Sequence, residues 1–185
     1  MNPEKNNKRE RFIKNLTIER SKTSQEGYSL AQDFFNKIST EYPGLGYPDR
    51  EAMDPFNPGR IDRKTQRTAI TYAARVSGAV VGVLTGEEIM GEKKERGQLI
   101  FRGQAFLVDP KFQQTNVAEQ LITQIQSDYD NIVIAPVPLG GKPSYSQLHE
   151  SSRSEALRRY YRRFGFEEHK RDNTMRWRKE RNEGI

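Results

Sequence analysis

The chain of 185 residues carries 31 Lys and Arg against 25 Asp and Glu, and it contains no cysteine. The absence of cysteine excludes disulfides, thiolate metal ligands and a catalytic thiol, and it fits a cytoplasmic protein. Because only two histidines are present, we expect no metal site. No apolar run approaches the roughly 20 residues that cross a bilayer, so we also expect no membrane partner.

A chain of this length predicts one compact domain with a sizeable core. We assign this domain to residues 12–181. A polar, charged stretch at 1–11 is expected to form a flexible basic tail, and residues 182–185 form a short second tail.

Positive charge is concentrated near the two ends of the chain. Residues 1–22 hold seven Lys or Arg against three Glu, and residues 153–181 hold eleven against five acidic residues. Such basic ends could meet nucleic acid, an acidic protein or the phosphates of a cofactor, but a solvated charged surface explains them equally well. The oligomeric state stays open at this stage.

The first predicted elements are a strand and an amphipathic helix. A β-prone run at 16–18 predicts the strand. Thr23 and Glu26 have the spacing of a capping box, and apolar residues then recur at helical intervals. The next connection, residues 43–65, is rich in Pro, Gly and charge, with room for a short helix around 50–53. It is either a substrate-side lid or a poorly ordered insertion.

Two strands, 68–76 and 79–85, flank Ser77-Gly78, which is typical of a hairpin turn. Glu87 and Glu88 close the second of these strands. The hairpin precedes a longer strand, 99–108, which is β-prone and mostly apolar.

A polar turn and a helix follow this longer strand. The strand ends at Asp109-Pro110, because proline cannot donate to a ladder. A helix begins at Val117 and carries its apolar residues on one face. Between them lie residues 113–116, where the first N–H groups of the helix have no carbonyl partner and point outward. A helix end of this kind attracts phosphate.

A short apolar run at 132–135 predicts a buried strand. A strand, a helix and a strand in this order imply a right-handed crossover, so we expect locally parallel pairing with 99–108. Glycines and prolines at 136–141 then lead the chain out of the sheet.

The last predicted helix has an apolar stripe and a basic stripe, and it stops at Gly165. The apolar stripe holds Ala156, Leu157, Tyr160, Tyr161 and Phe164. The basic stripe holds Arg158, Arg159, Arg162 and Arg163, which we interpret as a solvated or partner-facing surface. Trp177 is expected to pack on the last strand.

The central turn resembles that of the GCN5-related N-acetyltransferase (GNAT) family, in which a strand ending V-x-P leads through a Q/R-x-x-G-x-G/A turn into a helix. Residues 108–112 match the approach, Gln113 the first turn position, and Val117 and Ala118 the last two. Asn116 departs from the pattern, because the family usually has glycine there. Asparagine is the residue that best tolerates a left-handed backbone in place of glycine.

The segment before Gly165-Phe166 resembles the family's A-x-x-x-Y-x-x-x-G-F motif. Counting back from Gly165 places Tyr161 at the tyrosine, which in the family lies near the coenzyme sulfur. Leu157 then stands at the alanine position, and Ser154 stands where the family often has an asparagine that contacts the coenzyme.

The resemblance implies an α/β fold with a mixed, largely antiparallel sheet of about six or seven strands flanked by helices. It also implies transfer of an acetyl group from acetyl-coenzyme A to an amine acceptor, which could be a small molecule, a peptide or a protein. The residues expected to bind the coenzyme are Phe106, Leu107, Val108, Gln113, Gln114, Thr115, Asn116, Val117, Ala118 and Ser154.

For the chemistry, Tyr161 is the expected proton donor to the departing thiolate. Backbone donors at 106–108 would polarise the thioester carbonyl. Three acidic residues qualify as the base, and none stands out: Glu87, Glu88 and Asp109. The alternative function is that of a GNAT-like domain that has lost catalysis and holds nucleic acid or a protein partner.

Overall fold

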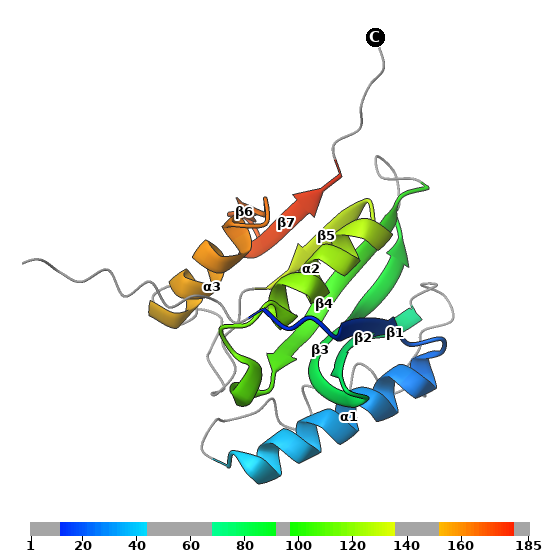
Figure 1. Cartoon of the computed structure of the whole chain (residues 1–185). Helices are drawn as coiled ribbons and strands as arrows, with labels where there is room; N and C mark the ends of the chain where they lie inside the picture. Colours follow the sequence, from blue (N-terminus) through cyan, green and yellow to red (C-terminus); the bar gives the residue numbers. More distant parts are fainter. Residues whose placement is uncertain (1–11, 44–67, 92–96, 136–151, 180–185) are drawn as a thin grey trace, which may run out of the picture.

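The computed structural model describes residues 12–43, 68–91, 97–135 and 152–179. These residues form one sheet with helices on both faces (Figure 1). The elements in chain order are β1 (Leu16–Arg20), α1 (Ser24–Glu41), β2 (Thr68–Val76), β3 (Ala79–Met90), β4 (Leu99–Val108), the 3₁₀ turn η4 (Pro110–Phe112), α2 (Val117–Asp128), β5 (Asn131–Ile134), α3 (Ser152–Arg162), β6 (Glu167–His169) and β7 (Thr174–Arg178).

Several predicted segments lie outside the described residues. They are the tails at 1–11 and 182–185, nearly all of the connection at 43–65, and the loop at 136–141. Among the helices that are described, none is both long and apolar enough to cross a membrane.

The seven strands follow the order β1-β2-β3-β4-β5-β7-β6. Every neighbouring pair is antiparallel except β4 and β5, which are parallel and are connected through α2. The predicted mixed, largely antiparallel sheet is therefore confirmed. The prediction that the second hairpin strand ends at Thr85 is wrong, because residues 86–90 continue to pair with β4.

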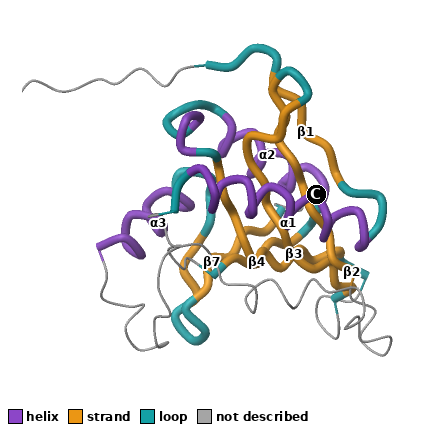
Figure 2. The backbone as a smooth tube through the Cα atoms, turned by 90° about the horizontal axis from the view of Figure 1, so that it is seen from below, coloured by secondary structure: helices purple, strands orange, loops and turns teal. Residues whose placement is uncertain are grey.

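Side chains on the two faces of the sheet form separate clusters. Along β2, Ala69 and Ala73 pack with α1, whereas Ile70 and Tyr72 belong to the cluster shared by α2 and α3. This alternation is the period of two that a strand imposes. Helix α1 thus covers one face, and α2 and α3 cover the other. Figures 1 and 2 show that, along the row of strands, α3 lies toward the end of the sheet that is opposite to β1 and β2.

Helix α1 begins at the predicted capping box. The Thr23 hydroxyl accepts the Glu26 amide at 3.1 Å, and the Glu26 carboxylate accepts the Lys22 amide at 2.7 Å. These bonds satisfy amide groups that the helix cannot satisfy internally. The inner face of the helix buries four apolar side chains, namely Ala31, Phe34, Phe35 and Ile38.

A β-bulge interrupts the pairing of β3 with β4. Thr85 faces Ala105 and Gly86 faces Gly103, so Gln104 is the extra residue on β4. A bulge bends its strand and increases the local twist. The parallel pairing of β4 with β5 ends at the same Gly103. Among the described residues, the pairing of β4 with β5 therefore ends where β4 bends.

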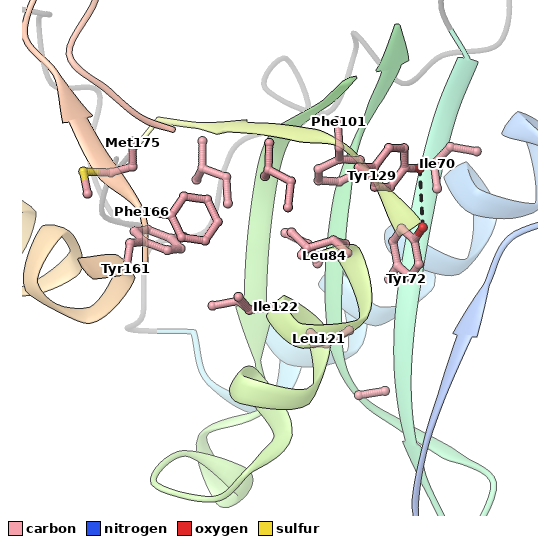
Figure 3. Packing of buried hydrophobic residues seen from close by; sticks show 14 of the residues in the cluster. Ile70, Tyr72, Leu84, Phe101, Leu121, Ile122, Tyr129, Tyr161, Phe166 and Met175 are labelled. Carbon is pink, nitrogen blue, oxygen red and sulfur yellow. Dashed lines mark hydrogen bonds between the residues drawn. The ribbon is translucent and has the colours of Figure 1, made fainter. Parts of the chain in front are cut away.

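A chain of polar contacts runs along the edge of the cluster shared by α2 and α3, and Figure 3 draws one of its bonds, between Tyr72 and Tyr129. The Tyr72 hydroxyl donates to Asp128 at 2.6 Å and lies 3.4 Å from the Tyr129 hydroxyl, which donates to Glu88 at 3.0 Å. Arg20 completes the chain with a 2.5 Å contact to Glu88. Burial raises the pKa of Tyr129 to about 12. Burial together with the bond to Asp128 raises the pKa of Tyr72 well above its usual value.

We expect the free energy of unfolding to fall as the pH rises above about 10, the usual pKa of tyrosine. An unfolded tyrosine releases its proton there, whereas Tyr72 keeps its proton in the folded state. The folded protein then binds more protons than the unfolded chain, so stability declines with pH. Tyr72→Phe should make this decline shallower by up to about 1.4 kcal/mol per pH unit. Urea unfolding between about pH 9 and about pH 11 measures the slope, and equal slopes in both proteins would contradict the assignment.

Candidate functional site

The open edge of β4 is the centre of the candidate site. After its last pair with β5, the strand continues to Val108, and no described residue pairs with it on that side. The Asp109 amide donates to the Val81 carbonyl of β3 at 2.9 Å. Because ladder bonds alternate along an antiparallel strand, the Leu107 amide also faces β3, and the amides of Phe106 and Val108 face the opening.

The side chains of residues 106–108 alternate between the two faces of the sheet. Phe106 and Val108 are half-buried against the cluster shared by α2 and α3. Leu107 is buried in the cluster on the α1 face. Of the three predicted residues on this strand, Phe106 and Val108 therefore offer a backbone N–H to the opening, while the Leu107 amide faces β3.

The turn between β4 and α2 has its left-handed residue at an unexpected position. Gln114 adopts a φ of 63°, whereas Asn116, which the sequence suggested for such a backbone, has a φ of −76°. The physical reason lies in α2, because the Asn116 carbonyl accepts the Gln120 amide at 2.9 Å as the first bond of the helix. The backbone of Asn116 is thus already close to helical.

The Asn116 side chain holds a segment that is distant in the sequence. Its Oδ1 accepts the Ile13 amide at 2.9 Å, and its Nδ2 donates to the Ile13 carbonyl at 3.4 Å. The side chain does not cap α2. The Thr115 hydroxyl instead accepts the Val117 amide at 3.3 Å. Glycine has no side-chain amide and could not make these two bonds.

The start of α2 presents amide groups at the surface. The described residues supply no acceptor for the N–H groups of Ala118 and Glu119, the second and third residues of the helix. The side chains of Gln113 and Gln114 are exposed beside them. A helix end of this kind carries partial positive charge and favours an anion. The turn predicted to bind phosphate therefore has the donors that phosphate requires.

Val117 anchors the turn through its side chain, unlike the exposed residues Gln113 and Gln114. Its side chain is fully buried. It packs so closely on β3 that a Cβ added to Gly82 would lie 3.0 Å from Val117 Cγ1. This contact fixes the first turn of α2 against the sheet, so Val117 positions the neighbouring donors.

Tyr161 lies on the buried face of α3. Its ring centroid is 5.8 Å from that of Tyr160 and 5.5 Å from that of Phe166 (Figure 3). Burial raises the pKa of the Tyr161 hydroxyl, so this group is neutral and holds its proton. The described part of the chain supplies no hydrogen-bond partner for this hydroxyl. Helix α3 ends at Arg162, three residues before the predicted stop at Gly165, which closes the following turn with a φ of 79°.

Ser154 lies two helical turns before Tyr161 on α3 and is fully buried. Tyr161 shares its cluster with Val117 of α2, and Phe106 and Val108 of β4 pack against the same cluster. The fold thus brings the predicted catalytic residue, the start of α2 and the open edge of β4 to one face of the sheet.

The three acidic residues considered as a base have separate surroundings. Glu88 contacts Arg20 and Tyr129, as described above. Asp109 is buried, accepts the Lys111 amide at 2.9 Å and lies 3.6 Å from Lys37. Glu87 stands directly opposite Arg102 on the β3–β4 ladder.

Arg158 differs from its predicted place on a solvated stripe. It is only 4% exposed. Its guanidinium donates to Asn173 at 2.5 Å and lies 3.4 Å from Glu168 and 3.8 Å from Glu155. These partners come from the β6–β7 hairpin and from α3 itself. Arg158 therefore joins α3 to the hairpin, which the sequence pattern of the helix alone does not reveal.

A groove that the sequence did not predict lies on the opposite face of the sheet. It has a volume of about 350 Å³ and crosses β4, β5 and β7. Since Phe101, Ile132 and Met175 belong to the cluster shared by α2 and α3, their neighbours along each strand face this groove. The polar residues that line it include Arg102, Gln104, Asn131, Arg176 and Arg178.

No protein-family model and no curated protein sequence matches the chain. Solved structures do match its fold. An acetyltransferase of the GNAT family from Staphylococcus aureus is 12% identical, with a TM-score of 0.50 over 83% of this chain and 84% of that one. A GCN5-related glucosamine N-acetyltransferase region of a fungal multi-domain β-N-acetylglucosaminidase is 15% identical, with a TM-score of 0.52 over 82% of this chain and 17% of that one.

The two sequence motifs suggested the GNAT family, and the comparison with solved structures, which does not depend on these motifs, gives the same fold. The seven-stranded, mostly antiparallel sheet with its single parallel pair agrees with the fold of these structures. The chain has the fold of the GCN5-related N-acetyltransferases.

Proposed function

We propose that the protein is an N-acetyltransferase that moves an acetyl group from acetyl-coenzyme A to an amine acceptor. The observation that carries the proposal is the opening between β4 and β5, which has backbone donors on the strand and further donors at the start of α2. One elongated ligand with a diphosphate at one end and a carbonyl at the other would use both sets.

The phosphate end fits the start of α2. The N–H groups of Ala118 and Glu119 lack acceptors among the described residues, and backbone groups of this kind bind phosphate without the need for a basic side chain. Gln113, Gln114 and Thr115 flank them. Asn116 contributes by fixing the turn through Ile13. The predicted coenzyme residues of this turn therefore act mainly through their backbone.

The acetyl end fits the open edge of β4. Bound acetyl-coenzyme A would supply an acetyl group activated as a thioester. The N–H groups of Phe106 and Val108 both face the opening, about 7 Å apart along the strand, so one of them would hold the thioester carbonyl oxygen as negative charge develops on it. Donors that are fixed by a strand require no reorganisation during the reaction, which is why such an arrangement lowers the barrier.

Tyr161 would complete the chemistry. When the amine nitrogen bonds to the acetyl carbon and the carbon–sulfur bond breaks, the sulfur needs a proton. Tyr161 holds its proton because its burial raises the pKa of the hydroxyl, and it would pass this proton to the sulfur. The amine must be neutral to attack, and once it bonds to the acetyl carbon its nitrogen releases one proton to water, while the Tyr161 phenolate regains a proton from water. Ser154, on the same side of α3, would contact the coenzyme.

Removal of one backbone donor tests the strand edge. Val108→Pro removes an N–H that faces the opening and leaves the ladder bonds of β4 intact, so the variant should fold. We expect calorimetry to show acetyl-coenzyme A binding to the wild type, and binding about 2–12-fold weaker in the variant, the effect of one lost hydrogen bond. Val108→Ala keeps the N–H and is the matched control.

Equal binding by the proline variant would exclude the Val108 amide as a donor. The absence of any heat or thermal shift in the wild type at high coenzyme excess would overturn the acetyltransferase proposal. The alternative of a non-catalytic binding module would then lead.

A second experiment separates catalysis from coenzyme binding. Tyr161→Phe keeps the ring that packs on Phe166 but removes the proton, so turnover should fall about 10²–10⁴-fold while most of the coenzyme affinity remains. Thiol release in the presence of a panel of amines and peptides measures turnover. Tyr160→Phe, the neighbouring tyrosine on α3, is the control and should stay close to the wild type. Unchanged turnover in the Tyr161 variant would remove this residue from the mechanism.

A further inference from the structure

The groove on the α1 face reaches the opening between β4 and β5. Gln104 and Ala135 are the first residues beyond the last pair of these strands, and both line the groove. Helix α1 packs against β2 and β3 and does not contribute to the lining. A ligand in the groove and a coenzyme on the other face would therefore meet at one gap in the sheet.

The charged side chains that line the groove differ in whether other described residues already bind them. Arg176 contacts Asp172 and donates to the Thr174 hydroxyl. The Asp172 carboxylate also accepts the Thr174 hydroxyl at 2.7 Å, and His169 Nδ1 lies 2.9 Å from the same carboxylate. Burial alone would raise the pKa of the Asp172 carboxyl. The bonds from Thr174 and His169 and the Arg176 guanidinium instead hold it well below its usual range. This cluster is satisfied internally.

Arg102 is the exception. Its side chain is exposed in the groove, two residues before Gln104. No hydrogen bond or ion pair joins its guanidinium to another described residue, even though Glu87 stands opposite on the ladder. Guanidinium binds carboxylate and phosphate through paired, charge-assisted hydrogen bonds. The groove therefore offers one anion-binding group close to the gap.

We propose that the groove receives an acceptor amine that also carries an anionic group, a carboxylate or a phosphate, which Arg102 binds. This inference rests on the proposed acetyltransferase function, and it names the class of acceptor.

The distance between Arg102 and Phe106 along β4 sets how far the anionic group of the acceptor must lie from its amine. Phe106, whose amide faces the gap, lies four residues after Arg102, which is about 13 Å along a strand. The arginine side chain spans only part of that distance. The anionic group must therefore be separated from the amine by several bonds. The α-amino group of a free amino acid, whose carboxylate is two bonds away, does not fit.

Acetyl transfer to a series of linear ω-aminocarboxylates, from aminopropanoate to aminooctanoate, tests the proposal against alkylamines of equal length. We expect kcat/KM to be about tenfold or more higher for the best ω-aminocarboxylate, the usual effect of a charge-assisted bond. Arg102→Gln should abolish this preference and leave alkylamine transfer unchanged, and Arg102→Lys should restore part of it. A parallel series of ω-aminoalkyl phosphates distinguishes the two anions.

Arg75→Gln, on β2, removes the same charge elsewhere in the sheet and is the matched control. Equal use of charged and neutral amines, or a preference that survives in Arg102→Gln, would overturn the proposal. Calorimetry of the best ω-aminocarboxylate without coenzyme provides a readout that does not require transfer. Binding that depends on Arg102 in a protein without transfer activity would support the groove and refute the acetyltransferase function, whereas no binding and no preference would refute the groove alone.

Discussion

The end of the pairing between β4 and β5 is the constraint on which the site depends. A strand in a sheet must satisfy its N–H groups on two sides, and β4 has a partner on only one side after Gly103 among the described residues. The bulge at Gln104 turns the strand at that point. Gly86 makes the bend possible, because a Cβ there would lie 2.5 Å from the Arg102 carbonyl oxygen. Exposed donors, the position of α2 and the reach of the groove all follow from this local departure from regular pairing.

The two faces of the sheet carry different kinds of surface. On one face, α2 and α3 pack on the sheet through a single apolar cluster, which rigidly positions backbone donors and one neutral hydroxyl. On the other face, α1 packs mainly on β2 and β3, and among the described residues a polar groove lies over β4, β5 and β7. Beside the end of the β4–β5 pairing, one face of the sheet is therefore apolar and covered by helices, and the other carries a polar groove.

The sequence predicted the parts of this structure that depend on local patterns. Proline at 110, the apolar face of α2 and the glycine at 165 predicted where elements begin and end, because each acts within a few residues. The position of the left-handed turn residue was harder to predict from the sequence. The first hydrogen bond of α2 holds the Asn116 backbone close to helical, and Gln114 adopts the left-handed conformation instead. The burial of Arg158 depends on Asn173 and Glu168 in a later hairpin. The groove combines three strands that are far apart in the chain, so no single segment encodes it.

The bond pair between Asn116 and Ile13 has a practical consequence for work with this protein. Ile13 is held by Asn116, the residue just before α2, so a chain shortened past residue 13 would lose both of these bonds. A shortened form of the protein that is used to measure ligand affinity should therefore keep residue 13, so that the turn at the start of α2 retains both bonds.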